Sequence, residues 1–68
     1  MKKIKIRDKV IRLGQLLKLS EIASTGGEAK MMIQNGEVTV NGEQELRRGA
    51  QLKSGDIVAV GTISVMVE

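Results

Sequence analysis

The chain has 68 residues, enough for one domain, and it contains no cysteine, histidine or aromatic residue. Zinc sites of the usual kind, disulfide bonds and Ser-His or Cys-His hydrolases are therefore excluded. The missing aromatic rings also exclude the stacking platforms with which most single-strand binders hold bases. The net charge of +3, from 11 basic and 8 acidic residues, permits a polyanionic partner without requiring one.

Residues 3–7, KIKIR, alternate basic and apolar side chains, which predicts a strand with Ile4 and Ile6 facing the core. The basic side chains of this region are expected on a solvated face that protects a sheet edge, and a contact with phosphate is the alternative. Because charges interrupt every apolar run, neither a signal peptide nor a membrane span is predicted. We expect a cytoplasmic protein.

Residues 11–23, IRLGQLLKLSEIA, place Leu13, Leu16 and Leu17 at the i, i+3, i+4 spacing of a short amphipathic helix. Gly14 weakens this prediction, because glycine costs about 1 kcal/mol relative to alanine inside a helix. A second helix is indicated by Ala29, Met32 and Ile33 at the same spacing, followed by Asn35-Gly36 as its end.

The start of the second helix reads STGGE. Thr25 and Glu28 have capping-box spacing, in which the Thr25 hydroxyl accepts the Glu28 amide and the Glu28 carboxylate accepts the Thr25 amide. An ordinary helix start explains these two residues, but it does not explain Gly26 and Gly27. A first turn without side chains exposes backbone amides to an anion, and Lys30 one turn later favours a phosphate of a polymer. The GxxxxGK[ST] pattern of a nucleotide-binding loop is absent.

The second half of the chain is rich in strand signals. Residues 37–43, EVTVNGE, predict a strand followed by a turn at Asn41-Gly42. Residues 43–56 are polar and are expected to be irregular. DIVAV and ISVMV predict two strands joined by a turn at Gly61-Thr62. The order of strand, two helices and several strands predicts a single α+β domain over residues 1–68.

Several of these motifs together resemble the S4 RNA-binding domain: residues 24–30 (STGGEAK), the run 36–42 (GEVTVNG) and the later Gly55-Asp56-Ile57-Val58. The similarity covers about residues 12–60. It is closest in character to the small stand-alone bacterial members of the YaaA or YbcJ type, which share LGQLLKL and the Arg47-Arg48-Gly49 run. The resemblance implies an S4-like αL motif, in which two short packed helices lie against a small, mostly antiparallel sheet.

The resemblance also implies an RNA-binding face composed of Ser24, Thr25, Gly26, Gly27, Lys30, Arg47, Arg48 and Lys53. One position departs from the family pattern. Many S4 domains carry an arginine after the serine, where this chain has Thr25 and two glycines. Either backbone amides replace the arginine as the phosphate contact, or the affinity is lower. Arg47 and Arg48 have a second interpretation as a solvated pair beside Glu43 and Glu45.

The expected function is that of a non-catalytic, monomeric protein that binds structured RNA, ribosomal RNA above all, through phosphate contacts and shape. No cofactor, metal, membrane or small-molecule substrate is expected. One alternative is a ribosome-assembly or protein-interaction adaptor without direct RNA contact. Another is a ubiquitin-like sulfur carrier, which is disfavoured because the sequence ends in VMVE and not in Gly-Gly.

Overall fold

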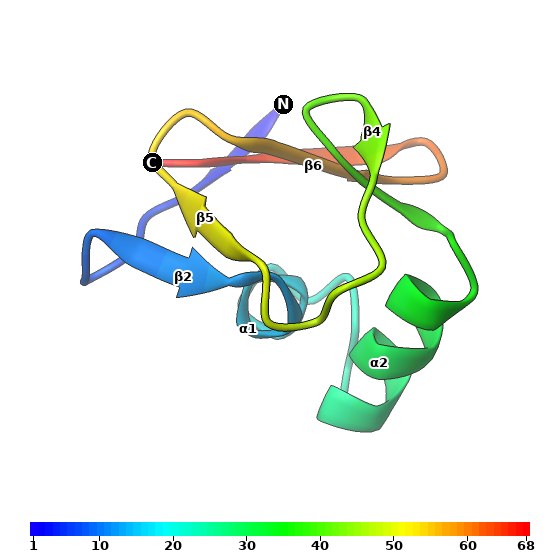
Figure 1. Ribbon diagram of the computed structural model, residues 1–68. Helices are drawn as coiled ribbons and strands as arrows, with labels where there is room; N and C mark the ends of the chain where they lie inside the picture. The colour runs from blue at the N-terminus through cyan, green and yellow to red at the C-terminus, as the bar shows by residue number, and fades with distance from the viewer.

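The computed structural model describes all 68 residues and places two short helices on one side of a five-stranded sheet (Figure 1). In chain order the elements are β1 (Lys2–Ile4), β2 (Val10–Arg12), α1 (Leu13–Leu19), α2 (Gly26–Gln34), β3 (Val38–Val40), β4 (Glu43–Gln44), β5 (Gln51–Lys53), β6 (Ile57–Val60) and β7 (Ile63–Val67). Neither helix is long and apolar enough to cross a bilayer.

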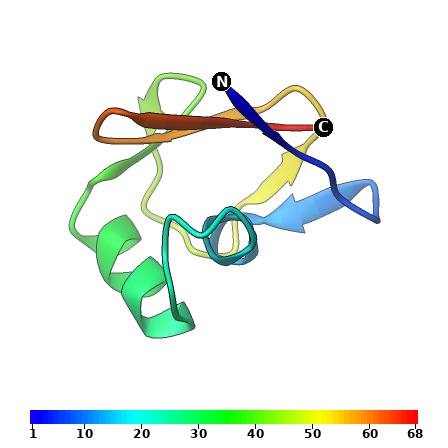
Figure 2. The ribbon, with the colours of Figure 1, turned by 180° about the vertical axis from the view of Figure 1, so that it is seen from behind.

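The main sheet has the strand order β1-β7-β6-β3-β4. Its neighbouring strands are antiparallel except for β1 and β7, which run parallel with Ile4 opposite Val67. Strands β2 and β5 form a separate antiparallel ribbon, which lies beside α1 on the side away from α2 (Figures 1 and 2). The architecture confirms the predicted α+β fold with two helices and a mostly antiparallel sheet.

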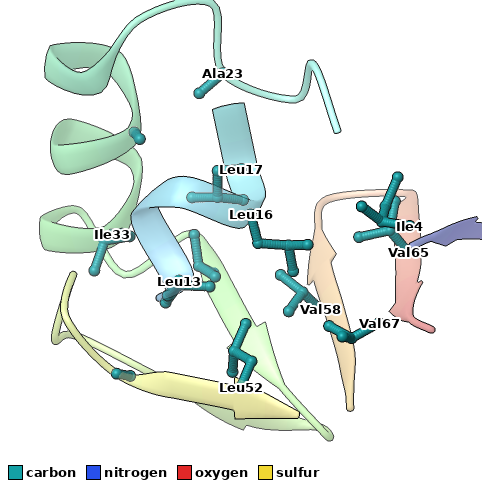
Figure 3. Packing of buried hydrophobic residues seen from close by; sticks show 13 residues of the cluster. Ile4, Leu13, Leu16, Leu17, Ala23, Ile33, Leu52, Val58, Val65 and Val67 are labelled. Atoms are coloured by element: carbon teal, nitrogen blue, oxygen red, sulfur yellow. The ribbon is translucent and has the colours of Figure 1, made fainter. Parts of the chain in front are cut away.

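The core lies between the helices, the ribbon and the inner face of the sheet (Figure 3). Leu13, Leu16 and Leu17 on α1 are fully buried, as the helical spacing predicted. Ala29 and Ile33 supply the buried face of α2. The whole cluster contains only aliphatic side chains: Ile4, Leu13, Leu16, Leu17, Ala23, Ala29, Ile33, Val38, Ala50, Leu52, Val58, Val65 and Val67.

Three expectations about the strands are wrong. The first strand ends at Ile4, and Ile6 is only half-buried in the segment that bends toward β2. Residues 43–56 are not irregular, because β4 and β5 lie within them. Ile11 belongs to β2 and not to the first helix. These strands have two or three residues each, which is too short for local periodicity to reveal them. In addition, β1 and β2 pair with partners distant in sequence, whereas β4 pairs with β3 across the Asn41-Gly42 turn.

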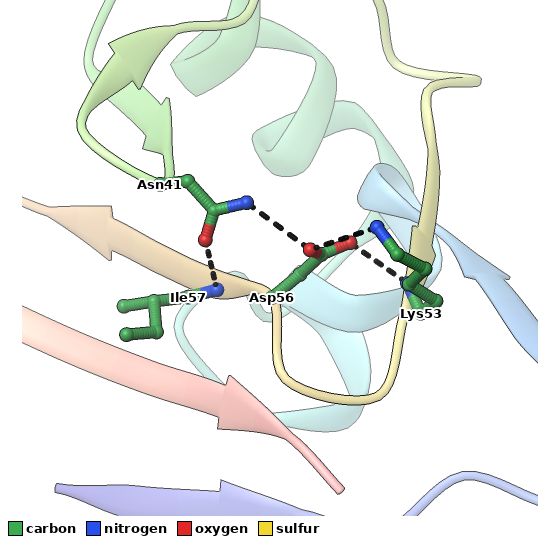
Figure 4. Close-up of polar contacts among 4 residues, drawn as sticks. All are labelled: Asn41, Lys53, Asp56 and Ile57. Atoms are coloured by element: carbon green, nitrogen blue, oxygen red, sulfur yellow. Dashed lines mark hydrogen bonds and ion pairs between the residues drawn. The ribbon is translucent and has the colours of Figure 1, made fainter.

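Asn41 and Asp56 connect the turn after β3 to the turn before β6 (Figure 4). The Asn41 side chain donates to Asp56 Oδ1 at 3.1 Å and accepts the amide of Ile57 at 2.9 Å. The other Asp56 oxygen accepts the backbone amide of Lys53 at 2.9 Å. The Lys53 amide, followed by the Asn41 side chain and the Lys53 charge, lowers the pKa of the buried Asp56 carboxyl.

Candidate nucleic-acid interface

Of the two hydrogen bonds in the predicted capping box of α2, the structure contains one and lacks the other. Thr25 Oγ1 accepts the amide of Glu28 at 3.0 Å, which confirms Thr25 as the N-cap. The Glu28 carboxylate does not reach the Thr25 amide. It extends one residue further to Ser24, where it accepts the amide at 3.3 Å and the hydroxyl at 2.9 Å. The Ser24 hydroxyl is therefore engaged within the protein, whereas the Thr25 hydroxyl proton is free to donate.

Gly26 and Gly27 occupy the first turn of α2 without any internal reason for being glycine. Their backbone φ angles are negative, so no left-handed conformation requires them. A Cβ on Gly26 would meet nothing within 4 Å, and one on Gly27 would meet only Thr25 Oγ1 at 3.8 Å. Their amides donate to no group of the protein. The first turn thus presents two accessible backbone donors at the positive end of the helix.

The loop between β4 and β5 is docked on the first turn of α1 (Figure 1). Two amides of α1 donate to this loop, from Leu13 to the Ala50 carbonyl at 2.9 Å and from Gly14 to the Arg48 carbonyl at 3.0 Å. A Cβ on Gly14 would lie 2.7 Å from Arg48 Cγ, which is too close for a real contact. Gly14 is therefore a glycine because the stem of Arg48 crosses the helix at this position.

This docking creates a hollow of about 330 Å³ between α1, α2 and the loop, which we call the α1–α2 hollow. The cations Arg12, Lys18 and Arg48 line it, and no carboxylate does. All three side chains are free of ion pairs, since the two ion pairs of the protein involve other residues. The complete lining is Arg12, Gly14, Gln15, Lys18, Gly26, Ala29, Arg48 and Gly49.

Two of the predicted RNA-binding residues are paired with carboxylates outside this hollow. Arg47 makes bidentate contacts of 3.1 Å with Glu45, and the same side-chain hydrogen bonds lower the pKa of Glu45 and raise that of Arg47. Lys53 Nζ lies 3.5 Å from Asp56 Oδ1. Lys53 is also opposite Val10 in the ribbon, at the end away from Arg12.

The structure thus brings together two of the predicted residues, Gly26 and Arg48, in one hollow. Lys30 is exposed on α2 and does not line it. The sequence analysis did not include Arg12 and Lys18 in the RNA-binding face, although they supply two of the three cations of the α1–α2 hollow. The signal that could have indicated them is Gly14, a glycine inside a helix that marks a close approach by another segment. No group of three or more acidic side chains is placed to hold a metal ion.

The arrangement of two helices on a small, mostly antiparallel sheet, with a basic hollow between the helices, is the one found in the family identified by sequence comparison. Residues 4–68 match the S4 domain model, and the chain belongs to the S4 domain family. It is 44% identical over 57 residues to the Bacillus subtilis (strain 168) protein named "Probable ribosome maturation protein RlbA". That similarity covers 84% of this chain and 80% of the relative.

A solved structure shares the fold. The crystal structure of the 30S ribosomal protein S4e from Thermoplasma acidophilum matches with a TM-score of 0.64 at 22% sequence identity. The match covers 85% of this chain but only 31% of the ribosomal protein, so this chain corresponds to about a third of it. At this level of identity the similarity establishes the fold and not the binding residues.

Proposed function

We propose that this protein is a non-catalytic RNA-binding protein that acts as a monomer on structured ribosomal RNA during ribosome maturation in the bacterial cytoplasm. The observation that carries the proposal is the α1–α2 hollow, where three cations without ion pairs face a helix start with free amides. This combination suits a phosphate, because side-chain charge and backbone donors converge on one anion. Membership of the S4 family and the name of the Bacillus subtilis relative support the ribosomal context.

The proposed contacts fall into two groups. Arg12, Lys18 and Arg48 neutralise phosphates in the hollow, and the amides of Gly26 and Gly27 donate to a phosphate oxygen. Thr25 through its hydroxyl proton and Lys30 on the exposed side of α2 extend this surface. Arg47 and Lys53 would join it only after leaving Glu45 and Asp56, and Ser24 supports the cap through Glu28.

The chemistry of the chain favours folded RNA over single strands. With no aromatic side chain, the protein has no flat surface on which an unpaired base could stack. Cations and backbone amides read the position of phosphates, which is fixed in helices and other stable RNA folds. We therefore propose recognition by shape with little readout of base sequence.

Binding to a structured ribosomal RNA fragment across a salt series tests this proposal. Each phosphate contact contributes about −0.7 to −0.9 to the slope of log affinity against log salt. The variant R12A/K18A/R48A should therefore lose about two to three units of slope. Its matched control is K2A/K3A/K9A, which removes the same charge from residues outside the α1–α2 hollow. Absorbance at 260 nm in sedimentation experiments reports the RNA alone, because the protein has no aromatic residue.

Two results would contradict the proposal. If the wild type does not bind at low salt, the protein does not contact RNA directly, and the adaptor alternative gains support. If both triple variants lose the same slope, the contact is a diffuse effect of net charge and not a site. Circular dichroism on each variant separates loss of binding from loss of fold.

A further inference from the structure

A second hollow lies on the other side of α1, between this helix and the segment that joins β1 to β2. It encloses about 440 Å³, and we call it the β2–α1 hollow. Lys5 and Arg7 line it together with one carboxylate, Asp8.

The two cations of this hollow are free to meet an external anion. Neither Lys5 nor Arg7 forms an ion pair or a side-chain hydrogen bond, although Asp8 lies in the same lining. Because neither cation is paired with Asp8, the donors of both side chains are free to contact a phosphate. The apolar part of the lining includes Val10 and Leu19, which are 45% and 53% exposed. Cations beside exposed apolar carbons suit the alternation of phosphate and sugar along a nucleic-acid backbone.

The two hollows adjoin at Gln15, which lines both. The Gln15 side-chain oxygen accepts the amide of Arg12 at 3.3 Å, so the residue is held at the start of α1. Its amide NH₂ group has no partner within the protein and can donate to a ligand that extends from one hollow into the other. The two hollows together are lined by one carboxylate, Asp8, and by five cations: Lys5, Arg7, Arg12, Lys18 and Arg48.

We infer that the β2–α1 hollow is a second phosphate-binding position, occupied by another backbone segment of the same RNA that fills the α1–α2 hollow. This inference rests on the proposed function. The RNA then crosses the start of α1 at Gln15 and contacts the protein on both sides of the helix. Such a ligand must present two backbone segments at once, as a folded RNA does and a short single strand without fixed shape does not.

The pair of variants K5A/R7A and K2A/K3A tests the inference. Both remove two positive charges from the first part of the chain, but Lys2 and Lys3 lie on β1 and line neither hollow. With the same structured ribosomal RNA, K5A/R7A should reduce the salt slope by about one to two units, because each lost phosphate contact removes about 0.7 to 0.9. K2A/K3A should change it by much less. The substitution D8N should strengthen binding, because it removes the one carboxylate of the surface.

The outcomes separate this inference from the proposed function. If R12A/K18A/R48A weakens binding while K5A/R7A behaves like K2A/K3A, the second position does not exist and the proposed function stands. If the wild type binds no structured RNA, both fail. Combining K5A/R7A with the triple variant provides a further check, since two separate positions should lose slope additively. A combined variant with no additional loss would contradict a second position.

Discussion

Gly26, Gly27 and Gly49 differ from the other five glycines of the chain in having no internal cause. Four of the others adopt positive φ, and Gly14 makes room for Arg48. Each of the three could carry a Cβ without a clash, and two of them line the α1–α2 hollow. Glycine is favoured where a ligand approaches the backbone closely, so these three positions support the proposed contact with phosphate.

The substitutions G26A and G27A test whether the amides of Gly26 and Gly27 contact a phosphate. Alanine should leave the free energy of unfolding unchanged or raise it by up to about 1 kcal/mol, because alanine is the better helix former. Affinity for structured RNA should fall by about tenfold, because the added Cβ keeps the phosphate away from the amide and a hydrogen bond to a charged group is worth about 1.5 kcal/mol. Thermal unfolding and RNA titration of the same samples provide both values. Unchanged affinity in both variants would mean that these amides do not contact phosphate.

At the scale of single residues, sequence reasoning succeeded where the interaction is local. Thr25 and Glu28 are three residues apart in one helix, and the predicted bond between the Thr25 hydroxyl and the Glu28 amide exists. It failed where a contact joins distant segments. Arg12 and Lys18 enter the site only because the loop at Arg48 docks on α1, and no spacing in the sequence reveals this docking.

The same division holds for the secondary-structure elements. The sequence predicted the elements that carry periodic apolar residues or clear turn signals, which are α1, α2, β3, β6 and β7. The ribbon of β2 and β5 was missed, because β5 has Leu52 as its one buried residue in a polar stretch. Strand β2 of this ribbon ends at Arg12, directly before α1, and so positions Arg12 at the edge of the hollow.

The turns after β3 and before β6 depend on Asp56, and D56N should destabilise the protein. The asparagine side chain at position 56 has one acceptor oxygen, so it loses the hydrogen bond to either the Lys53 amide or the Asn41 side chain. This loss should lower the free energy of unfolding by about 1–3 kcal/mol. The pKa of Asp56 is lowered by folding, so its contribution is complete above the unfolded pKa of about 3.9 and is lost as the pH falls through the folded pKa.

Urea unfolding followed by circular dichroism between pH 2 and 7 measures this effect. The wild type should be more stable than D56N at pH 7, and the difference should shrink at the acidic end. D8N is the matched control, because Asp8 is exposed and makes no hydrogen bond. A difference that does not depend on pH would show that the charge of Asp56 does not stabilise the turns.

At the scale of the whole molecule, a domain of 68 residues is marginally stable, so ligand binding should be visible in its unfolding. RNA at 100 times its dissociation constant stabilises the folded state by about 2.7 kcal/mol. For a domain of this size, that energy corresponds to a rise in Tm of about 10–20 °C. Calorimetry with and without structured RNA measures the shift. It should become much smaller in R12A/K18A/R48A and decline with added salt, and a shift that resists both changes would point to another binding surface.

The parallel pairing of β1 with β7 joins the first strand of the chain to the last (Figure 2). β1 is an edge strand of three residues that bonds to one neighbour only, and the amide of Glu68 donates to the Ile4 carbonyl at 2.8 Å. Closing a loop of nearly the whole chain is entropically expensive, so this strand should detach first in local opening. Its amides should exchange with deuterium fastest among the sheet. Because Lys5 and Arg7 follow β1 in the chain, an RNA bound in the β2–α1 hollow would stabilise the pairing of β1 with β7 and slow the exchange of the β1 amides.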